Sequence, residues 1–356
     1  MTTPPPVPSA PVAPPAPPSP TITYLDGADV ERLCADLPVV DRAHETLLAY
    51  GRKEAGLTPE AALRWTTRAG AAARSLILPG WFGDSYGCKI INASLGNHLL
   101  GQPRAAGLIV LNDPETARPV CIMEGSRISA LRTAGVSLAA VRAVRDPAGI
   151  TRVAFLGCGR QAEVHRELLA TVCPGVEELF LFDQDAARAH ELAAAWRASE
   201  PATAVTVTGG AREAVERAQL TIAVTTTTQP YVELDWVPAG GTFVNVSLDD
   251  AAESLLLGCD HLFVDDWDLV LDDDHRLLGA LARAGRISGP GTHAPAGGRA
   301  VGAGLSALFA GDYDRPVGAD ERVVINPFGM GIQDIALAAA VHERALALGV
   351  GLQLER

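Results

Sequence analysis

The 356-residue chain lacks any long hydrophobic run, and this absence limits the class of protein it can be. No apolar stretch approaches the roughly 20 residues of a membrane-spanning helix, and the N-terminus lacks the basic-then-apolar pattern of a signal peptide. Basic residues are also few, since 29 Lys and Arg stand against 42 Asp and Glu, for a net charge of −13. With no basic stripe to offset this excess, we expect neither a nucleic acid nor a membrane as a partner.

Paired cysteines and clustered histidines are missing as well. The six cysteines are scattered without paired spacing, which predicts reduced thiols in a cytoplasmic protein rather than disulfides or a zinc site. The eight histidines show no metal-ligand spacing, so we expect no metal. The apolar fraction of 48% and charged fraction of 20% are those of a globular protein, long enough here for two domains.

A glycine-rich turn between a buried strand and a helix organises the chain. The apolar residues 153–156 end at Gly157, and a helical pattern follows. Gly157 permits the tight turn, and Gly159 lets the backbone approach a pyrophosphate. The free N–H groups at the start of the helix, at Arg160 and Gln161, would face the phosphates. Such a turn can also belong to an ordinary βαβ unit, so it needs a second feature.

The second feature is the acid at the end of the next apolar run. Asp183 follows residues 179–182, close to the usual offset for a carboxylate that accepts a hydrogen bond from a ribose 2′-OH. The two features together predict a dinucleotide site. Because an acid at this position would repel a 2′-phosphate, we expect NAD rather than NADP.

The order of strand and helix patterns predicts two domains. Residues 151–265 alternate between them, which implies a mainly parallel, doubly wound sheet. We therefore predict an α/β fold in which a Rossmann domain is inserted into a β-rich α+β domain. The expected boundaries are a disordered Pro-rich tail at 1–20, a composite outer domain formed by 21–145 and 320–356, and a Rossmann domain at 146–319.

Several local expectations accompany this division. Asp29 should cap a helix that starts at Val30, and a second helix should cover residues 42–53. Cys121 should begin a turn that leads into a long helix ending near residue 143. The Gly-, Ala- and Pro-rich residues 285–304 should form a loop or flexible insertion.

Two cations stand in apolar surroundings, where a charge is costly unless it is paired or used. Lys89 lies in the strand pattern Cys-Lys-Ile-Ile, and could also be an edge-strand lysine that reaches solvent. Arg132 lies on an apolar helix and is suited to hold a carboxylate in two parallel bonds. A buried structural salt bridge is the alternative for Arg132.

Polar side chains follow two consecutive strand patterns of the predicted sheet. Thr225 and Thr226 come after the first, and Ser247 and Asp250 come after the second. Ligands of open α/β sheets collect at strand carboxyl ends, so we expect Thr225, Thr226 and Ser247 to contact the cofactor. A carboxylate there could serve as general base for a substrate amine, unless it lies on a solvated loop. The later acid pairs and runs, at 265–266 and 272–274, look like exposed charge clusters.

Three motifs together resemble the ornithine cyclodeaminase/mu-crystallin family. They are Glu124-Gly-Ser-Arg-Ile-Ser-Ala-Leu-Arg132-Thr133-Ala, Gly157-Cys-Gly-Arg-Gln and Phe328-Gly-Met-Gly-Ile-Gln-Asp334. The first and third look most like the branch of 2,3-diaminopropionate biosynthesis. Its dehydrogenases convert N-(2-amino-2-carboxyethyl)-L-glutamate to 2,3-diaminopropionate and 2-oxoglutarate with reduction of NAD. The resemblance implies a homodimer built through the outer domain, with the amino-acid substrate between the two domains.

The resemblance also implies roles for single residues. Lys89 resembles the lysine that lines the substrate pocket, and Arg132 the arginine that grips the substrate α-carboxylate. Thr133 follows Arg132 in the shared Arg-Thr-Ala piece, and both are expected beside the cofactor. Asp250 matches the catalytic aspartate, and Arg64 looks like an additional carboxylate-binding arginine.

Three alternatives stay open at this point. A cyclodeaminase would form proline or pipecolate from ornithine or lysine with the same catalytic residues. An imino-acid reductase would run the chemistry in reverse. A non-catalytic, crystallin-like binder would keep the cofactor fold alone. Asp249, the neighbour of Asp250, is a second candidate for the base.

Overall fold

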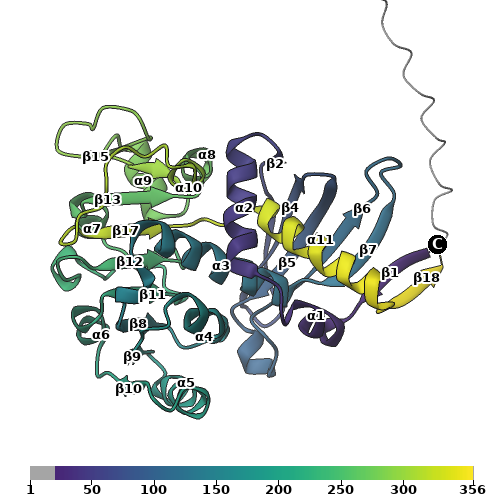
Figure 1. Ribbon diagram of the computed structural model, residues 1–356, viewed down its shortest axis with the longest axis horizontal. Helices are drawn as coiled ribbons and strands as arrows, with labels where there is room; N and C mark the ends of the chain where they lie inside the picture. Colours follow the sequence, from purple (N-terminus) through teal and green to yellow (C-terminus); the bar gives the residue numbers. More distant parts are fainter. Residues whose placement is uncertain (1–20, 356) are drawn as a thin grey trace, which may run out of the picture.

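The computed structural model describes residues 21–355 and contains two large sheets side by side (Figure 1). The Pro-rich tail expected at 1–20 lies outside the described residues. Helices α2 (Val39–Gly51) and α3 (Ser126–Val144) lie between the sheets and pack against each other (Figure 1). Within residues 21–355, no helix is both long and apolar enough to cross a membrane.

The outer sheet has eight strands in the order β18-β1-β7-β6-β5-β4-β2, with β3 paired to β4. Its pairs are antiparallel except for β1 with β7. The strands are β1 (Thr21–Leu25), β2 (Ala55–Leu57), β3 (Ala61–Thr66), β4 (Ala72–Phe82), β5 (Ser85–Ser94), β6 (Ala105–Asn112), β7 (Pro119–Glu124) and β18 (Leu352–Glu355).

Helix α11 (Gly331–Leu348) crosses one face of this sheet and packs on β4, β5 and β6 (Figure 1). Glycines permit the close approach. A Cβ on Gly331 would lie 3.1 Å from Leu78 Cβ, and a Cβ on Gly87 would lie 2.3 Å from Val110 O and 2.9 Å from Ile335 Cδ1. The helix therefore lies close enough for its first turn to reach side chains that project from β5.

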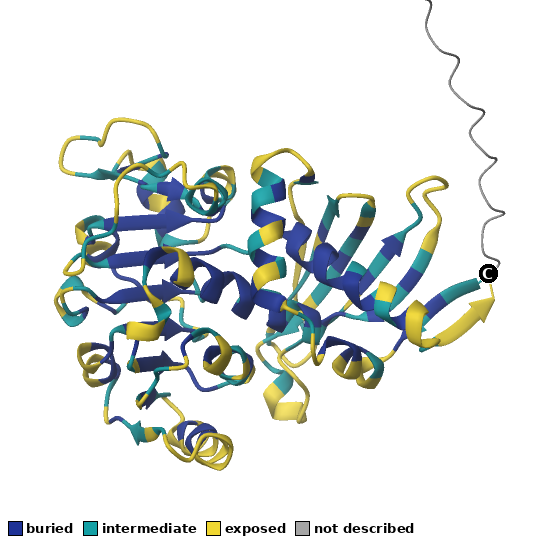
Figure 2. Ribbon diagram, viewed as in Figure 1, coloured by how far each residue is buried: buried dark blue, intermediate teal, exposed yellow. Residues whose placement is uncertain are grey.

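The second sheet is parallel throughout, in the order β10-β9-β8-β11-β12-β17-β13-β16. Its central strands are apolar and buried because helices cover both faces, whereas the edge strand β10 is partly exposed (Figure 2). The strands are β8 (Arg152–Leu156), β9 (Glu178–Phe182), β10 (Ala204–Val207), β11 (Leu220–Ala223), β12 (Thr242–Asn245), β13 (His261–Val264), β16 (Ala303–Gly304) and β17 (Val323–Asn326). The predicted α/β fold with a doubly wound Rossmann sheet is confirmed.

The remaining elements connect or cover these sheets. The helices are α1 (Gly27–Cys34), α4 (Arg160–Val172), α5 (Ala186–Ser199), α6 (Ala211–Arg217), α7 (Glu253–Gly258), α8 (Trp267–Asp272), α9 (Leu277–Arg283) and α10 (Leu305–Ala310). Three short 3-10 turns are η1 (Asn97–Leu100), η2 (Pro147–Gly149) and η3 (Leu234–Trp236), and β14 (Ile287–Ser288) pairs with β15 (Arg299–Ala300). The β8/β11 junction, where the strand order reverses, is where doubly wound sheets bind their ligands.

The boundary expected at residue 320 is wrong. Strand β17 (Val323–Asn326) pairs with β12 and β13 inside the second sheet, and all four of its residues are buried. The chain returns to the outer domain only after Asn326. Its apolar sequence fits a strand that is buried on both faces, as this position requires.

Three local expectations also need correction. Helix α1 begins at Gly27, and Asp26 is its N-cap because its side chain accepts from Asp29 N at 2.9 Å. Cys121 lies in β7 with its side chain buried, because the alternation that buries Met123 buries it too. Residues 285–304 contain the short strands β14, β15 and β16 rather than a plain loop.

The packing of α11 on β5 yields a prediction about Gly87. Gly87→Ala would place a methyl group against the Val110 carbonyl oxygen, so we expect a loss of about 1–3 kcal/mol in the free energy of unfolding. Gly149→Ala is the matched control, since a Cβ there meets no atom within 4 Å. Thermal and urea unfolding would measure both. Equal stability of the two variants would show that the sheet adjusts without cost.

Candidate functional site

A buried ion pair joins the outer sheet to α11. Lys89 Nζ donates to Asp334 Oδ2 at 2.6 Å and to Ser129 Oγ at 3.2 Å. Lys89 is 1% exposed and Asp334 is fully buried. Lys89 projects inward because Gly87 and Lys89 share the face of β5 that α11 covers, so it is not a solvent-reaching edge lysine. Burial and then the charge of Arg132 lower the pKa of Lys89 to about 8, against the opposing effect of Asp334.

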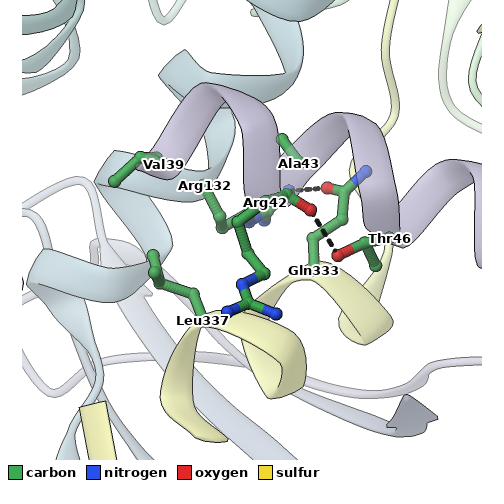
Figure 3. Close-up of a pocket in the computed structure, with 7 residues that line it drawn as sticks. All are labelled: Val39, Arg42, Ala43, Thr46, Arg132, Gln333 and Leu337. Carbon is green, nitrogen blue, oxygen red and sulfur yellow. Dashed lines mark hydrogen bonds between the residues drawn. The ribbon is translucent and has the colours of Figure 1, made fainter. Parts of the chain in front are cut away.

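Arg132, on α3, approaches the same carboxylate. Its Nε donates to Asp334 Oδ1 at 3.3 Å. One of its terminal nitrogens donates to Gln333 Oε1 at 3.4 Å (Figure 3). Gly329 has a φ of +89°, and a Cβ there would lie 2.4 Å from that terminal nitrogen. The outer-domain cluster, which we define as Lys89, Arg132 and Asp334, thus draws on β5, α3 and α11.

A second group of side chains lies at the carboxyl ends of β11 and β12. Asp250 is fully buried and accepts hydrogen bonds from Thr225 Oγ1 at 2.8 Å, from Tyr231 OH at 3.0 Å and from Ser247 Oγ. Burial raises the pKa of Asp250 above its ordinary value, although the three hydroxyl donors lower it. We call Thr225, Tyr231, Ser247 and Asp250 the sheet-edge cluster.

The two adjacent acids have different partners. Asp249 forms an ion pair with Arg276, the residue before α9, whereas Asp250 receives only uncharged donors. Leu248, just before them, has a φ of +74°, which sharply turns the chain there. Of the two acids, Asp250 is therefore the one without a cationic partner among the described residues.

The glycine turn has the geometry that a dinucleotide requires. Gly157 has a φ of +88°, and a Cβ there would lie 2.9 Å from Val224 O, whereas a Cβ on Gly159 would meet no atom within 4 Å. No side chain caps the first turn of α4, so its first N–H groups have no side-chain acceptor at the N-cap. The buried Gln161 Oε1 has no hydrogen-bond partner among the described residues. These residues fit NAD.

Asp183 lies beside this turn, where its carboxylate is half-buried. It accepts from Cys158 N and from Asp185 N, both at 2.8 Å. Arg160 instead points to the surface and pairs with Glu163 at 3.2 Å. The structure thus brings Gly157, Gly159, Gln161 and Asp183 together, and places the Arg160 side chain outside them.

Other predicted residues lie outside both clusters. Arg64 is exposed on β3, and Thr226 is exposed after β11. Thr133 is beside Arg132, but its hydroxyl donates to Ser129 O at 2.7 Å within α3. Among residues 21–355, no group of three or more His, Cys, Asp or Glu is placed to hold a metal ion.

Asp265 was expected in an exposed charge cluster, and that expectation is wrong. It is 1% exposed and accepts from Phe328 N at 2.9 Å and from Gly329 N at 2.6 Å. Burial raises its pKa to about 6. Its position after a buried strand, the same signal that marks Asp250, could have indicated this role. Asp334 and Tyr231 were also missed, although an acid among the apolar residues of α11 is itself a signal.

A single stretch of chain runs from one cluster to the other. Asn326, at the end of β17, accepts from Asn245 Nδ2 at 2.7 Å, and Asn245 Oδ1 accepts from Asp250 N at 3.3 Å. The Phe328-Gly329 turn held by Asp265 follows, and α11 then places Asp334 in the outer-domain cluster. Among the described residues, no hydrogen bond or ion pair links Asp250 directly to Lys89 or Arg132.

The chain has close counterparts among known proteins. It is 29% identical over 338 residues to the N-((2S)-2-amino-2-carboxyethyl)-L-glutamate dehydrogenase of Staphylococcus aureus (strain NCTC 8325 / PS 47), covering 93% of this chain and 97% of that protein. The crystal structure of CmnK matches with a TM-score of 0.86 at 33% identity, over 94% and 98% of the two chains. An archaeal alanine dehydrogenase dimer with bound NAD has the same fold, with a TM-score of 0.80 at 23% identity, over 94% and 99%.

The family itself follows from a direct match. The sequence profile of the ornithine cyclodeaminase/mu-crystallin family matches residues 49–349, which is most of the chain. The family resemblance predicted from the three motifs is thereby confirmed. The chain belongs to the ornithine cyclodeaminase/mu-crystallin family.

Proposed function

We propose that the chain is an NAD-dependent dehydrogenase that cleaves N-(2-amino-2-carboxyethyl)-L-glutamate to 2,3-diaminopropionate and 2-oxoglutarate. The observation that carries the proposal is the sheet-edge cluster, which sets a buried carboxylate beside a turn shaped for a dinucleotide. The near full-length likeness to a dehydrogenase of that name supports the substrate.

The reaction consumes one water and gives NADH and one proton besides the two products. NAD supplies the hydride acceptor for the glutamate Cα. Asp250 takes the proton of the secondary amine, and the C–N bond becomes an imine that Asp250 then helps water to hydrolyse. A raised pKa suits this task because it brings the carboxylate closer to the working pH.

The outer-domain cluster fixes the substrate. Lys89 and Arg132 bind its α-carboxylate, and Asp334 orients both cations through its ion pairs with them. The cofactor is contacted by Thr225, Thr226, Thr133 and Ser247. Asp183 accepts a hydrogen bond from its ribose hydroxyl. This arrangement holds the glutamate Cα over the nicotinamide, and such positioning is a large part of catalysis.

We also propose a cytoplasmic homodimer formed through the outer sheet. The face of this sheet that α11 does not cover presents apolar side chains, at Leu63, Trp65, Ile77, Tyr86 and Leu108, that are 39–66% exposed. A contiguous apolar face of this kind is typical of a subunit interface. The archaeal alanine dehydrogenase of the same fold is described as a dimer. The six cysteines are free, in keeping with a reducing compartment.

The first test is net cofactor reduction. With NAD and N-(2-amino-2-carboxyethyl)-L-glutamate, we expect NADH and 2-oxoglutarate to accumulate in equal amounts. Arg132→Lys keeps the charge but loses the two-pronged geometry, so KM should rise at least about tenfold. Formation of proline or pipecolate from ornithine or lysine without net NADH would identify a cyclodeaminase instead, and binding without turnover of any substrate would identify a binder.

The second test concerns the base. Asp250→Asn keeps size and hydrogen bonding but cannot accept the proton, so kcat should fall by about two to four orders of magnitude. The affinity for NAD, measured by fluorescence titration, should change little. In the unmodified enzyme kcat/KM should fall as the pH drops through the raised pKa of Asp250, because the base is then protonated. A greater loss of kcat in Asp249→Asn than in Asp250→Asn would assign the base to Asp249.

The third test concerns the dimer. Trp65→Asp places a charge on the apolar face, so the protein should become monomeric in light scattering while its circular dichroism is kept. Leu271→Asp is the control, since Leu271 is 44% exposed on α8, far from this face in the chain's topology. An unchanged mass for Trp65→Asp would argue that the subunits meet elsewhere.

A further inference from the structure

Tyr231 is joined to Asp250 by its backbone as well as by its hydroxyl. Tyr231 N and Val232 N both donate to the Asp250 carbonyl oxygen, at 3.0 Å and 2.9 Å. In the return direction, Ala252 N donates to Val232 O at 2.9 Å. The ring of Tyr231 packs against Trp236, with the ring centroids 6.2 Å apart. The phenol is therefore held beside the carboxylate of the proposed base, where its hydroxyl donates to Oδ1 at 3.0 Å.

The two oxygens of the Asp250 carboxylate have different surroundings. Each oxygen of an ionised carboxylate can accept about two hydrogen bonds. Oδ1 accepts two, from Thr225 Oγ1 at 2.8 Å and from the Tyr231 hydroxyl. Oδ2 accepts a bond from one side chain, the Ser247 hydroxyl. Among the described residues, Oδ2 is therefore the oxygen that keeps a free position for a further proton.

Ser247 can bond to Oδ2 in both protonation states of Asp250. Its hydroxyl has one hydrogen but two acceptors within reach, Oδ2 and the Ala223 carbonyl oxygen, which lies 3.1 Å away. While Asp250 is ionised, the hydrogen points to Oδ2. Once Oδ2 carries a proton, the hydroxyl can turn to Ala223 and accept a bond from Oδ2 instead. In either state Thr225 N, at 3.2 Å, donates to Ser247 Oγ.

Tyr231, by contrast, can only donate to Asp250. Its hydroxyl makes no other hydrogen bond in the part of the chain that the structure describes, so it has no second acceptor to turn to. Burial and then the charge of Asp250 raise the pKa of Tyr231 above its ordinary value, which keeps the phenol protonated near neutral pH. The Tyr231 bond thus stabilises the ionised form of Asp250 and opposes a proton on Oδ1.

We propose that Tyr231 is a positioning residue for the base, whose hydroxyl fixes Oδ1 of Asp250 and directs the proton of the substrate amine to Oδ2. The inference rests on the proposed function for the identity of that amine. As the hydride leaves the glutamate Cα for NAD, the electron pair of the N–H bond becomes the second bond of the imine. The proton released from the nitrogen forms the O–H bond at Oδ2, and Ser247 accommodates it by turning to Ala223.

The charged groups that act on this pair stay the same in a test that removes only the hydroxyl. Asp249 is the neighbouring acid whose charge raises the pKa of Asp250, and it forms an ion pair with Arg276. Asp183 is the acid whose charge raises the pKa of Tyr231. Tyr231→Phe keeps all three, so a change in pH dependence reports the lost hydrogen bond.

The kinetic test measures kcat/KM against pH. Tyr231→Phe removes a donor to the ionised carboxylate, so the acid limb should move upward by about one pH unit, while the plateau falls far less than in Asp250→Asn. Ser247→Ala should move the limb less, because that hydroxyl bonds to Oδ2 in both states. Tyr50→Phe is the matched control, since it removes a tyrosine hydroxyl from another carboxylate, Asp266 Oδ2 at 2.7 Å, and should leave the limb in place. A limb unmoved by Tyr231→Phe, or moved further by Ser247→Ala, would overturn the inference.

A titration without substrate separates this inference from the proposed reaction. In protein with isotope-labelled aspartate carboxyl groups, the NMR signal that is absent in Asp250→Asn belongs to Asp250. Its titration midpoint should be higher in Tyr231→Phe than in the unmodified protein, and unchanged in Tyr50→Phe. If no turnover occurs but the midpoint rises in Tyr231→Phe, the proposed reaction is wrong and the role of Tyr231 toward Asp250 stands. If turnover occurs and neither midpoint nor acid limb moves, the role of Tyr231 is wrong and the reaction stands.

Discussion

The buried carboxylate of Asp334 is the constraint on which the position of α11 against the outer sheet and α3 depends. Lys89 from β5 and Arg132 from α3 both donate to it, so three elements far apart in the sequence meet at one acid. A buried pair of this kind contributes little net stability, but removal of one partner leaves a stranded charge at a cost of about 3–5 kcal/mol. The cluster therefore fixes the position of α11 on the sheet, and the glycines at positions 87 and 331 permit this close packing.

The position of α11 also determines the path of residues 326–334, which connect β17 to the first turn of this helix. Asp265 holds the Phe328-Gly329 turn through two backbone N–H groups, and Gly329 packs against the Arg132 guanidinium. At its other end, Asn326 bonds to Asn245, which in turn accepts from the backbone of Asp250. In the proposed reaction, these short, buried contacts would set the position of a substrate bound by the outer-domain cluster relative to Asp250. Such positioning is what a hydride and a proton transfer at neighbouring atoms require.

The sequence predicted the parts of this site that depend on local patterns. The turn at Gly157 could be predicted because it depends only on residues next to it in the sequence. Asp183 could be predicted because it follows a recognisable apolar strand. Asp265 follows a buried strand just as Asp250 does, but its acidic neighbour made it look solvated, and burial is a tertiary property. The boundary at 320 failed for a similar reason, since pairing between distant strands leaves no mark in a short window of sequence.

The position of β17 has a consequence for how the chain reaches its native state. This strand lies between β12 and β13, yet more than fifty residues follow β13 before it arrives. During synthesis, the facing edges of β12 and β13 stay unpaired until β17 has been made. Unpaired strand edges can form hydrogen bonds with incorrect strands. The Rossmann sheet is thus complete only after residues up to Asn326 have been synthesised, and α11 follows its last strand in the chain. Completion of the sheet and docking of α11 are therefore linked events, so a truncated nascent chain has neither a closed sheet nor a finished site.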